Sequence, residues 1–205
     1  MFIPESFEVT NTDLLHSLIT GYPFGILIGS RDNTPEASHI PFVLDPERGP
    51  DGTLFGHIAR KNPQGVSFRN NQQMLVIFQG PHGYISPRWY NPGLAVPTWN
   101  YAVVHAYGTP RRIDDVAEIH RQQEELVATF EGPDGWTMDS QPDHYIEGML
   151  GGITAFEMPI DRIEGKFKLS QNRSVEDRRS VIAALTASDR PWDHALAELM
   201  RQQGF

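Results

Sequence analysis

The sequence predicts an α+β fold that is mainly β, on three observations. Apolar runs of strand length recur between residues 24 and 163, and clusters of Gly, Pro, Asn and Asp separate most of them. Two of these runs, Met74–Phe78 and Trp99–Tyr107, flank a long connection rich in aromatic residues and prolines. Helical spacing of apolar residues is confined to a few segments. Antiparallel strands with helices around them are therefore expected.

Composition narrows the class of protein. A chain of 205 residues can bury one substantial core, and the absence of Cys excludes disulfides and thiol nucleophiles and suits a reducing cytoplasm. The formal net charge of −9 disfavours indiscriminate binding to DNA or RNA, although it does not exclude a local basic patch. The start of the chain, MFIPESFEVT, lacks signal-peptide features, and no apolar run could cross a bilayer. We expect a cytoplasmic protein with no membrane segment.

The N-terminal part predicts one helix followed by three strands. The helix is capped within Thr10–Asp13 and stops at Gly21, because leucines and isoleucines recur between these points at helical spacing. A proline cannot donate to a strand ladder, so Pro41 predicts a sheet edge or a bulge, and we expect one side of this strand to be open to a ligand or a partner. The expected strands are Phe24–Ser30, Ala37–Leu44 and Thr53–Ile58, with a turn at Asp32–Pro35.

The C-terminal part predicts helices around a further strand. Helix Ile113–Phe130 is amphipathic, helix Asp143–Leu150 ends at two glycines, and Ile153–Ile163 has strand character. Two more helices follow Ser174, so we expect a mainly β domain over residues 1–170 and a helical extension over residues 171–205. The expected buried stripe of the amphipathic helix is Val116, Ile119, Gln123, Leu126, Val127 and Phe130.

The segment HIARKNPQGVSF places two cations where a strand runs into a short helix. Such a junction leaves backbone N–H groups free, and Arg60 and Lys61 stand beside them. This arrangement suits a phosphate. The alternative is a solvated basic pair at a helix start, and the segment by itself favours neither.

Other kinds of site find little support. The eight His residues show no compact ligand spacing and no Cys assists them, so no metal site is expected. The serine-hydrolase string GxSxG and the nucleotide fingerprints GxGxxG and GxxxxGK[ST] are all absent. Paired acidic residues such as Asp114-Asp115 lie on helix starts or faces, where solvation is their usual role.

Two basic clusters remain, together with the aromatic strands. Arg60 and Lys61 form the first cluster, and Lys166–Arg173 (KFKLSQNR) forms the second. A flavin mononucleotide needs a clamp for its phosphate, a stacking surface and polar groups along its ring edge, and these residues could supply all three. The aromatic rings could equally fill a core. The residues alone leave both interpretations open.

Several strings resemble the PaiB family, also called FMN-binding negative transcriptional regulators. They are MFIPESFE, PFGILIGS, SHIPF, GHIARKNPQ, VIFQGPHGYISPRWY, VPTWNYAVVHAYG and IEGKFKLSQNR, and they run almost from Met1 to the C-terminal helices. VPTWNY and GKFKLSQNR are long and unusual strings, which makes the resemblance specific. One departure is Gly65, since members often carry a tryptophan after NPQ.

The resemblance implies an FMN-binding split β-barrel with peripheral helices and a C-terminal helical pair. It further implies a homodimer with ligand sites between subunits and a phosphate held at His57–Asn62. The residues expected to bind the cofactor are His57, Ala59, Arg60, Lys61, Asn62, His39, Pro41, Trp99, Tyr101, His105, Lys168, Ser170 and Gln171.

The resemblance leaves the biochemical role open. The family name implies a transcriptional regulator, but a repressor needs a positive surface, and Arg173, Arg178 and Arg179 with Lys166 and Lys168 form the only concentrated basic stretch. DNA binding therefore finds no support in the net charge. The alternatives are a flavin-dependent oxidoreductase, a haem-binding or haem-degrading relative with His39, His57 or His105 as ligand candidates, and an interaction module without a ligand.

Overall fold

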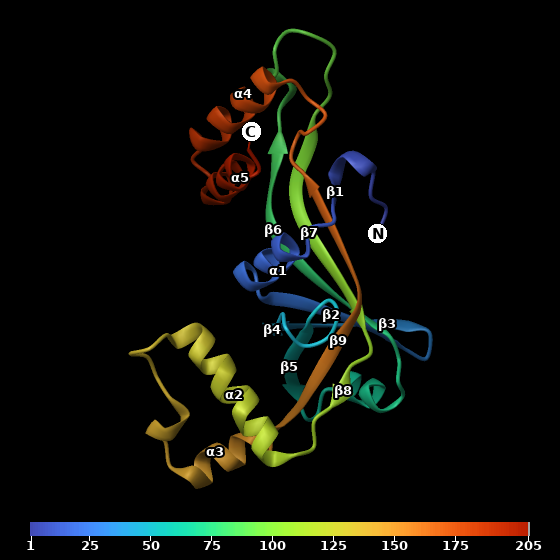
Figure 1. The fold of residues 1–205 in the computed structure, drawn as a ribbon, viewed down its shortest axis with the longest axis vertical. Helices are drawn as coiled ribbons and strands as arrows, with labels where there is room; N and C mark the ends of the chain where they lie inside the picture. Colours follow the sequence, from blue (N-terminus) through green and yellow to red (C-terminus); the bar gives the residue numbers. More distant parts are fainter. Residues whose placement is uncertain (205) are drawn as a thin grey trace. The chain divides into compact units, whose positions relative to one another are not determined.

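The computed structural model describes residues 1–204 and, at Arg69, the backbone alone. Within that range the chain is mainly β with several helices, as predicted, and the strand order is β3-β2-β6-β7-β9-β5-β4, with β1 and β8 paired to β9 (Figure 1). The strands are β1 Glu8–Val9, β2 Phe24–Arg31, β3 Thr34–Pro41, β4 Val43–Asp45, β5 Thr53–Ala59, β6 Met74–Ile85, β7 Thr98–Gly108, β8 Arg111–Arg112 and β9 Ile153–Lys168. The helices are α1 Thr12–Gly21, α2 Val116–Glu131, α3 Asp143–Leu150, α4 Val175–Thr186 and α5 Pro191–Gln202, with short 3₁₀ turns η1 Glu5–Phe7, η2 Pro63–Arg69, η3 Pro87–Trp89 and η4 Met138–Ser140.

The chain divides into two compact units, each made of several segments. Unit 1 comprises residues 1–18, 79–104 and 164–205, and unit 2 comprises residues 19–78 and 105–163. The sequence suggested a boundary at residue 170. In the structure, the helical segment after that residue belongs to unit 1 together with the N-terminus and the loop between β6 and β7.

Unit 2 contains the β2–β3 hairpin and the pairing of β5 with β9. Arg31 pairs with Thr34 across a two-residue turn at Asp32-Asn33, and Gly56 pairs with Phe156 in the antiparallel β5–β9 ladder. The end position of β3 in the strand order agrees with the edge strand predicted from Pro41. The expected strand Ala37–Leu44 is broken at Phe42, because this side chain turns into the core between β3 and β4.

Aromatic rings fill the core of unit 2. Phe42 meets Phe78 and Phe156 edge-on, with ring centroids 5.5 and 6.2 Å apart, and Phe68 lies 4.6 Å from Phe156. Edge-to-face contacts of this kind add to the free energy gained by burying the rings. Gly25 and Gly56 stand against these rings, where a side chain would collide with them. The core therefore depends both on the large phenylalanine rings and on the glycines that pack against them.

Helix α2 agrees with the predicted stripe only in part. Gln123 is buried as predicted, but Val116 is 70% exposed and Phe130 is 55% exposed, so both ends of the stripe were wrong. Gln122, which the stripe did not include, is buried as well. Its Nε2 donates to Gly56 O (3.2 Å) and to Phe156 O (3.0 Å), so it links the helix to the backbone of β5 and β9. The periodicity of the helix could not foresee these carbonyl partners.

Two strands are longer than predicted. Gly80 and Pro81 were interpreted as part of a turn, but both are buried within β6. A side chain at Gly80 would approach Leu18 Cδ1 to 3.0 Å, so this glycine serves close packing instead of a turn. Strand β9 likewise continues without a break through Pro159 and into the motif Gly165–Lys168.

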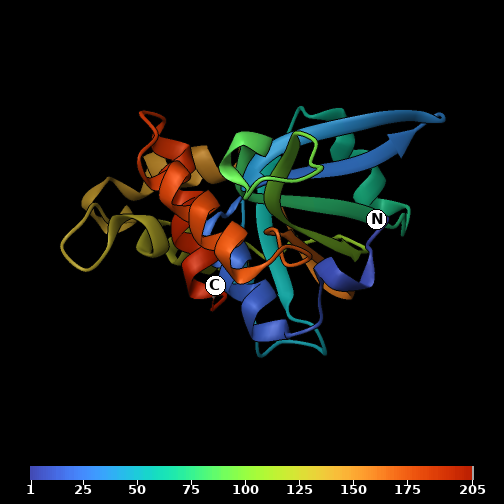
Figure 2. The same cartoon turned by 90° about the horizontal axis from the view of Figure 1, so that it is seen from above.

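Unit 1 joins the N-terminus and the C-terminal helices to the ends of the long strands. Strand β1 pairs with β9, Glu8 opposite Lys166, and the N-terminal amino group contacts Glu164 Oε2 at 2.6 Å. Helices α4 and α5 pack against each other, as Figure 2 shows. A serine caps α4, since Ser174 Oγ accepts from the backbone N–H of Asp177.

Candidate functional site

The predicted phosphate residues lie just after β5, in unit 2. Arg60 and Lys61 are exposed, and Asn62 caps η2 by accepting from Gln64 N–H at 3.0 Å. Asn62 Nδ2 also donates to Ser38 Oγ at 2.9 Å. This bond ties the junction to β3, the strand that carries the predicted residues His39 and Pro41. The structure thus places Asn62 in contact with Ser38, the residue that precedes His39 on β3.

The junction offers fewer free backbone N–H groups than we expected. Arg60 N–H donates to Gly152 O at 2.8 Å, and Asn62 N–H donates to Ala59 O at 2.8 Å. Gln64 N–H donates to Asn62 Oδ1, Gly65 N–H donates to Asn62 O, and Pro63 has no N–H. A phosphate held here would therefore depend mainly on side chains.

The side chains of Arg60 and Lys61 are free of carboxylates. Within residues 1–204, neither forms an ion pair, and Arg60 Nε contacts only a backbone oxygen, Ile153 O, at 3.3 Å. By contrast, Arg31 and Arg48 are neutralised by Glu36 (2.6 Å) and Glu157 (2.5 Å). Two adjacent, uncompensated cations in a chain of net charge −9 are suited to an external anion.

Arg60 also lines a pocket of about 290 Å³ that the sequence analysis missed. Arg112 and His120 contribute further basic groups to its wall, and Arg112 Nε lies 2.7 Å from Asp114 Oδ1. Arg112 belongs to the short strand β8, which pairs with β9. A two-residue strand carries no periodicity, so only the tertiary structure could bring it beside Arg60.

His57 faces a second pocket. It lies on β5, two residues before Ala59, and its side chain lines a pocket with α2 and α3 instead of the Arg60 pocket. Burial lowers the pKa of His57, because the charged imidazolium loses hydration there. The remaining predicted residue of unit 2, His105, lies on β7 with its ring 6.2 Å from that of Tyr107.

The predicted residues of unit 1 form a second group. Lys168 Nζ donates to Thr98 Oγ1 and to Trp99 O, both at 2.6 Å. Burial lowers the pKa of Lys168, and the positive charges of Lys166 and Arg173 lower it further. The Lys168 amino group is thus directed at β7, although a third N–H remains for another acceptor.

Ser170 and Gln171 are engaged inside unit 1. Ser170 Oγ accepts from Asn100 Nδ2 at 2.9 Å, and Gln171 Oε1 accepts from Leu169 N–H at 2.6 Å. Gln171 Nε2 donates in turn to Phe167 O. These bonds close the turn between β9 and α4.

Strand β7 presents its large rings on one face. The residues with even numbers from Asn100 to Gly108 are buried, whereas those with odd numbers remain partly or largely exposed. Trp99 meets Tyr84 edge-on at 6.2 Å, and Lys166 Nζ lies 5.5 Å from the Tyr101 ring. This alternation gives β7 an outward face with amphipathic rings and a cation beside it.

The predicted site residues therefore fall into two groups in different units. His57, Ala59, Arg60, Lys61, Asn62, His39, Pro41 and His105 belong to unit 2, and Trp99, Tyr101, Lys168, Ser170 and Gln171 belong to unit 1. Among the residues that the structure describes, no three His, Cys, Asp or Glu side chains gather to hold a metal ion. No described helix combines the length and the apolar character needed to span a bilayer.

Known structures define the class of this fold as the split β-barrel. The flavocytochrome Anf3 of Azotobacter vinelandii superposes with a TM-score of 0.66 at 11% identity, over 84% of this chain and 75% of that chain. The FAD and heme binding protein of Mycobacterium smegmatis gives a TM-score of 0.61 at 18% identity, over 86% and 79%. At such low identities the likeness establishes the fold alone.

Sequence similarity then identifies the family. Residues 1–162 match the family described as "Putative FMN-binding domain", and the chain is 34% identical over 206 residues to "Protease synthase and sporulation protein PAI 2" of Bacillus subtilis. That match covers 99% of this chain and 98% of the relative. The chain belongs to this FMN-binding family in its PaiB form, as the sequence strings predicted.

Proposed function

We propose that this protein binds FMN as a homodimer and acts as a ligand-responsive negative regulator of the PaiB type. The observation that carries the proposal is the pair Arg60 and Lys61. These two cations are adjacent and exposed, and no carboxylate among residues 1–204 neutralises them. They occur in a family described by FMN binding.

The phosphate of FMN is the part of the ligand that this pair would hold. Arg60 can present its terminal nitrogens to two phosphate oxygens, because only its Nε is used, by Ile153 O. Lys61 adds a second charge that can follow the phosphate as a flexible point charge. Asn62 fixes the start of the following turn through Ser38, so the two cations extend from an anchored backbone.

His39 and Pro41 on β3 are the residues that we propose beside the flavin ring. They belong to unit 2, as Arg60 and Lys61 do, and the bond from Asn62 Nδ2 to Ser38 Oγ joins β3 to the cationic pair. His39 is exposed and Pro41 is partly exposed, so both can be reached by a ligand. Bound FMN would supply redox chemistry, while these residues would bind and orient it.

Titration with FMN and with riboflavin tests the phosphate assignment directly, because the two ligands differ only in the phosphate. We expect FMN to bind at least about tenfold more tightly than riboflavin, since a hydrogen bond to a charged group contributes about 1.5–3 kcal/mol. In Arg60→Ala with Lys61→Ala, that preference should disappear while riboflavin affinity stays. Flavin fluorescence quenching gives both affinities.

Arg31→Ala with Arg48→Ala is the matched control, because it removes the same charge from cations that are already paired with Glu36 and Glu157. It should keep the preference for FMN. Equal affinities for FMN and riboflavin in the wild type would overturn the phosphate assignment. A Soret band in place of flavin absorbance in the purified protein would point to haem and overturn the cofactor assignment.

The dimer finds support in the exposed rings of β7 and is tested by its mass in solution. A twofold dimer covers strand faces of this kind at its interface. Light scattering after size exclusion should give twice the chain mass of 23.1 kDa. Trp99→Ser should weaken the dimer, and a monomeric wild type at micromolar concentration would contradict the proposal.

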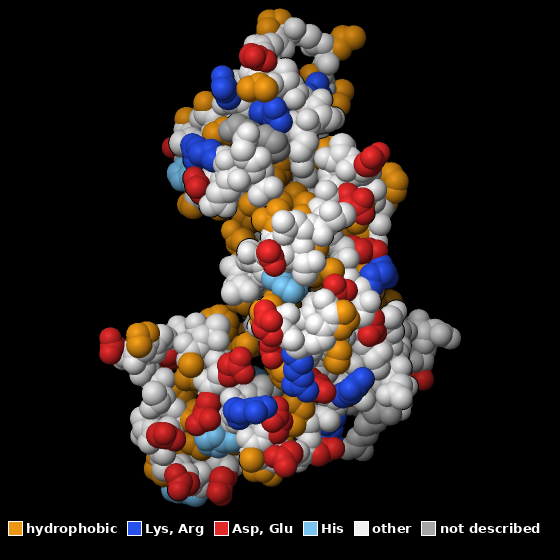
Figure 3. Space-filling view, in the orientation of Figure 1, with side chains coloured by type: hydrophobic (Ala, Val, Ile, Leu, Met, Phe, Trp, Pro, Cys, Tyr) orange, Lys and Arg blue, Asp and Glu red, His pale blue; other side chains and the backbone are white. Residues whose placement is uncertain are grey.

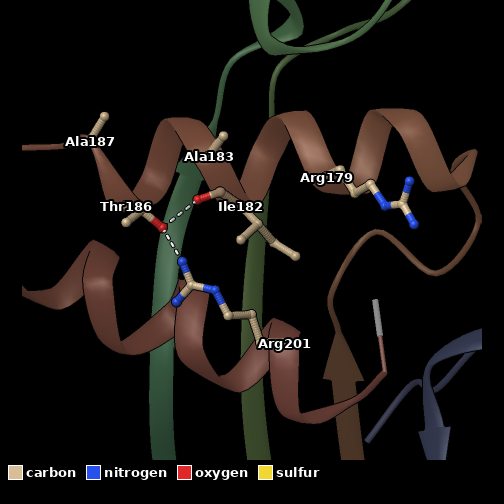
Figure 4. A pocket seen from close by; sticks show the side chains of 6 residues that line it. All are labelled: Arg179, Ile182, Ala183, Thr186, Ala187 and Arg201. Atoms are coloured by element: carbon tan, nitrogen blue, oxygen red, sulfur yellow. Dashed lines mark hydrogen bonds between the residues drawn. The ribbon is translucent and has the colours of Figure 1, made fainter.

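The regulatory role finds support in the resemblance to the PaiB family and in the C-terminal helices. Lys and Arg side chains gather over α4 and α5 in Figure 3, and these helices carry Arg178, Arg179 and Arg201. Figure 4 shows that Arg201 is bound to Thr186 Oγ1, at 2.5 Å, while Arg179 points away from it. Mobility shifts on the protein's own upstream DNA at physiological salt, with and without FMN, test this role. Retention that is lost between low and physiological salt would contradict it.

A further inference from the structure

A pocket of about 290 Å³ lies in unit 2 against β5, α2 and α3. It adjoins the Arg60 pocket, with which it shares Leu150 and Ile153, but neither Arg60 nor Lys61 lines it. Its wall is mainly apolar, with Val127, Trp136, Tyr145 and Met149 among its members. Pockets of this size, apolar with few polar groups, are typical of sites for small molecules.

Two polar nitrogens in this wall have no partner. Gln123 is only 9% exposed, and its Nε2 finds no hydrogen-bond acceptor among residues 1–204. His57 Nδ1 is buried and is likewise unpaired within that range. Nearly all buried polar groups in folded proteins are bonded, because leaving one unpaired costs its full hydration. Two unpaired nitrogens in one pocket therefore point to a partner from outside the chain.

The neighbouring glutamine shows what a purely structural role looks like. Gln122 Nε2 bonds to two backbone oxygens, Gly56 O and Phe156 O, and thereby fixes α2 to the sheet. Gln123 is the next residue of the same helix and is also buried, yet its Nε2 has no such bonds. Packing of α2 thus accounts for Gln122 Nε2, although Gln122 Oε1 is unpaired within residues 1–204, and it leaves Gln123 Nε2 unexplained.

The wall also constrains the charge and shape of the ligand. No Asp, Glu, Lys or Arg lines the pocket, and burial lowers the pKa of His57, which favours the neutral ring. A charged ligand would find no counter-ion here. Trp136, Tyr145 and Met149 keep part of their surface exposed, so the rim is open and is lined by groups that pack well on flat rings.

We infer that this pocket binds a small, uncharged, ring-bearing molecule whose carbonyl or ring-nitrogen acceptor meets Gln123 Nε2, with His57 Nδ1 as the second polar contact. This site goes beyond the proposed FMN function and does not rest on it. The apolar walls hold the ring, and Gln123 selects for the acceptor.

The test compares two probes of the same shape, 1-tetralone and tetralin, of which only the first carries a carbonyl acceptor. Isothermal titration of the full chain should show 1-tetralone binding about tenfold more tightly, the usual effect of one buried hydrogen bond. Gln123→Met should remove that difference. It should also raise the midpoint of thermal unfolding, because it replaces an unpaired amide with an apolar group of similar size.

Gln122→Met is the matched control on the same helix. It removes two hydrogen bonds, so it should lower the unfolding midpoint while the preference for 1-tetralone remains. Equal binding of the two probes, no binding of either, or an unchanged preference in Gln123→Met would overturn the inference. A preference for 1-tetralone that follows the monomer–dimer equilibrium would show that a second copy of the chain covers the pocket, which also overturns it.

The outcome is separable from that of the FMN proposal. Gln123→Met should leave the preference for FMN over riboflavin unchanged. Arg60→Ala with Lys61→Ala should leave the preference for 1-tetralone unchanged. Either proposal can therefore fail while the other stands.

Discussion

Asn100 donates a hydrogen bond of 2.9 Å from its side-chain amide to Ser170 Oγ, and both residues are buried. The bond joins VPTWNY on β7 to GKFKLSQNR at the end of β9, the two most unusual strings of the sequence. Lys168 adds two bonds between the same segments, to Thr98 Oγ1 and Trp99 O. These contacts give GKFKLSQNR a bracing role in unit 1.

Ser170 gives the first prediction, because its backbone has φ of 67°, a region that disfavours side chains. Ser170→Ala should lower the free energy of unfolding by about 1–2 kcal/mol, since it leaves the Asn100 amide without this partner. Ser170→Gly loses the same bond but relieves the backbone, so it should be the less destabilising change. Urea unfolding of the two variants gives the order, and the reverse order would contradict the strain argument.

The pH dependence of stability gives the second prediction. Burial lowers the pKa of His57 below its ordinary value of 6.5, so the unfolded chain takes up a proton at a higher pH than the folded chain does. As the pH falls from 7.5 through 6.5 toward the folded-state pKa, stability should therefore fall. Below the folded-state pKa both states are protonated and this loss levels off.

His57→Gln removes this contribution and should flatten the slope between pH 7.5 and pH 5.5 relative to wild type. Urea unfolding at several pH values measures it, and the difference between the two proteins cancels the other histidines. A steeper slope in the variant would be inconsistent with a buried neutral imidazole.

The β2–β3 turn gives the third prediction. Asp32 and Asn33 have φ of 51° and 60°, the left-handed conformations that a two-residue hairpin turn requires. Asn33→Gly should be neutral or stabilise the fold by up to about 1 kcal/mol, whereas Asn33→Val should destabilise it by about 1–2 kcal/mol. Chemical denaturation of both variants decides the matter. Equal stabilities would show that the turn does not hold this conformation in solution.

Packing at Gly25 gives the fourth prediction. A Cβ atom there would lie 2.9 Å from a carbon of the Phe78 ring and 3.0 Å from the Phe42 ring. Gly25→Ala should therefore lower the free energy of unfolding by about 1–3 kcal/mol. Gly21→Ala is the control, because nothing lies within 4 Å of its added Cβ and the change should cost little. A tolerated alanine at Gly25 would mean that the aromatic core yields more readily than its contacts indicate.

Much of the fold was predictable, because the spacing of apolar residues and the positions of glycines and prolines mark most of its helices and strands. Helix α3 has the predicted bounds, and α1 and β5 differ from the prediction by a residue or two. The predictions failed where the position of a residue depends on contacts with residues far away in the sequence. Pro81 lies inside β6 although a proline usually breaks a strand, and Gln122 belongs to the core of unit 2 because β5 and β9 offer it two carbonyl oxygens.

The candidate site was predicted unevenly for the same reason. Arg60 and Lys61 stand out in the sequence because they follow a strand directly, and the structure shows them exposed and without an ion pair to any carboxylate that it describes. Arg112 was missed, since β8 contains two residues and carries no pattern of its own. Two of the N–H groups expected to be free at the junction, those of Arg60 and Asn62, donate to Gly152 O and Ala59 O.

The sequence by itself determined the family, the mainly β class and the position of the cationic pair. Each of these can be recognised from residues that are near one another in the chain. Tertiary structure alone decided which polar groups are satisfied. Gln122 and Gln123 have the same chemistry and adjoining positions, yet only the first meets backbone oxygens. A hydrogen bond depends on distances of about 3 Å between groups far apart in sequence, and only the folded chain sets those distances.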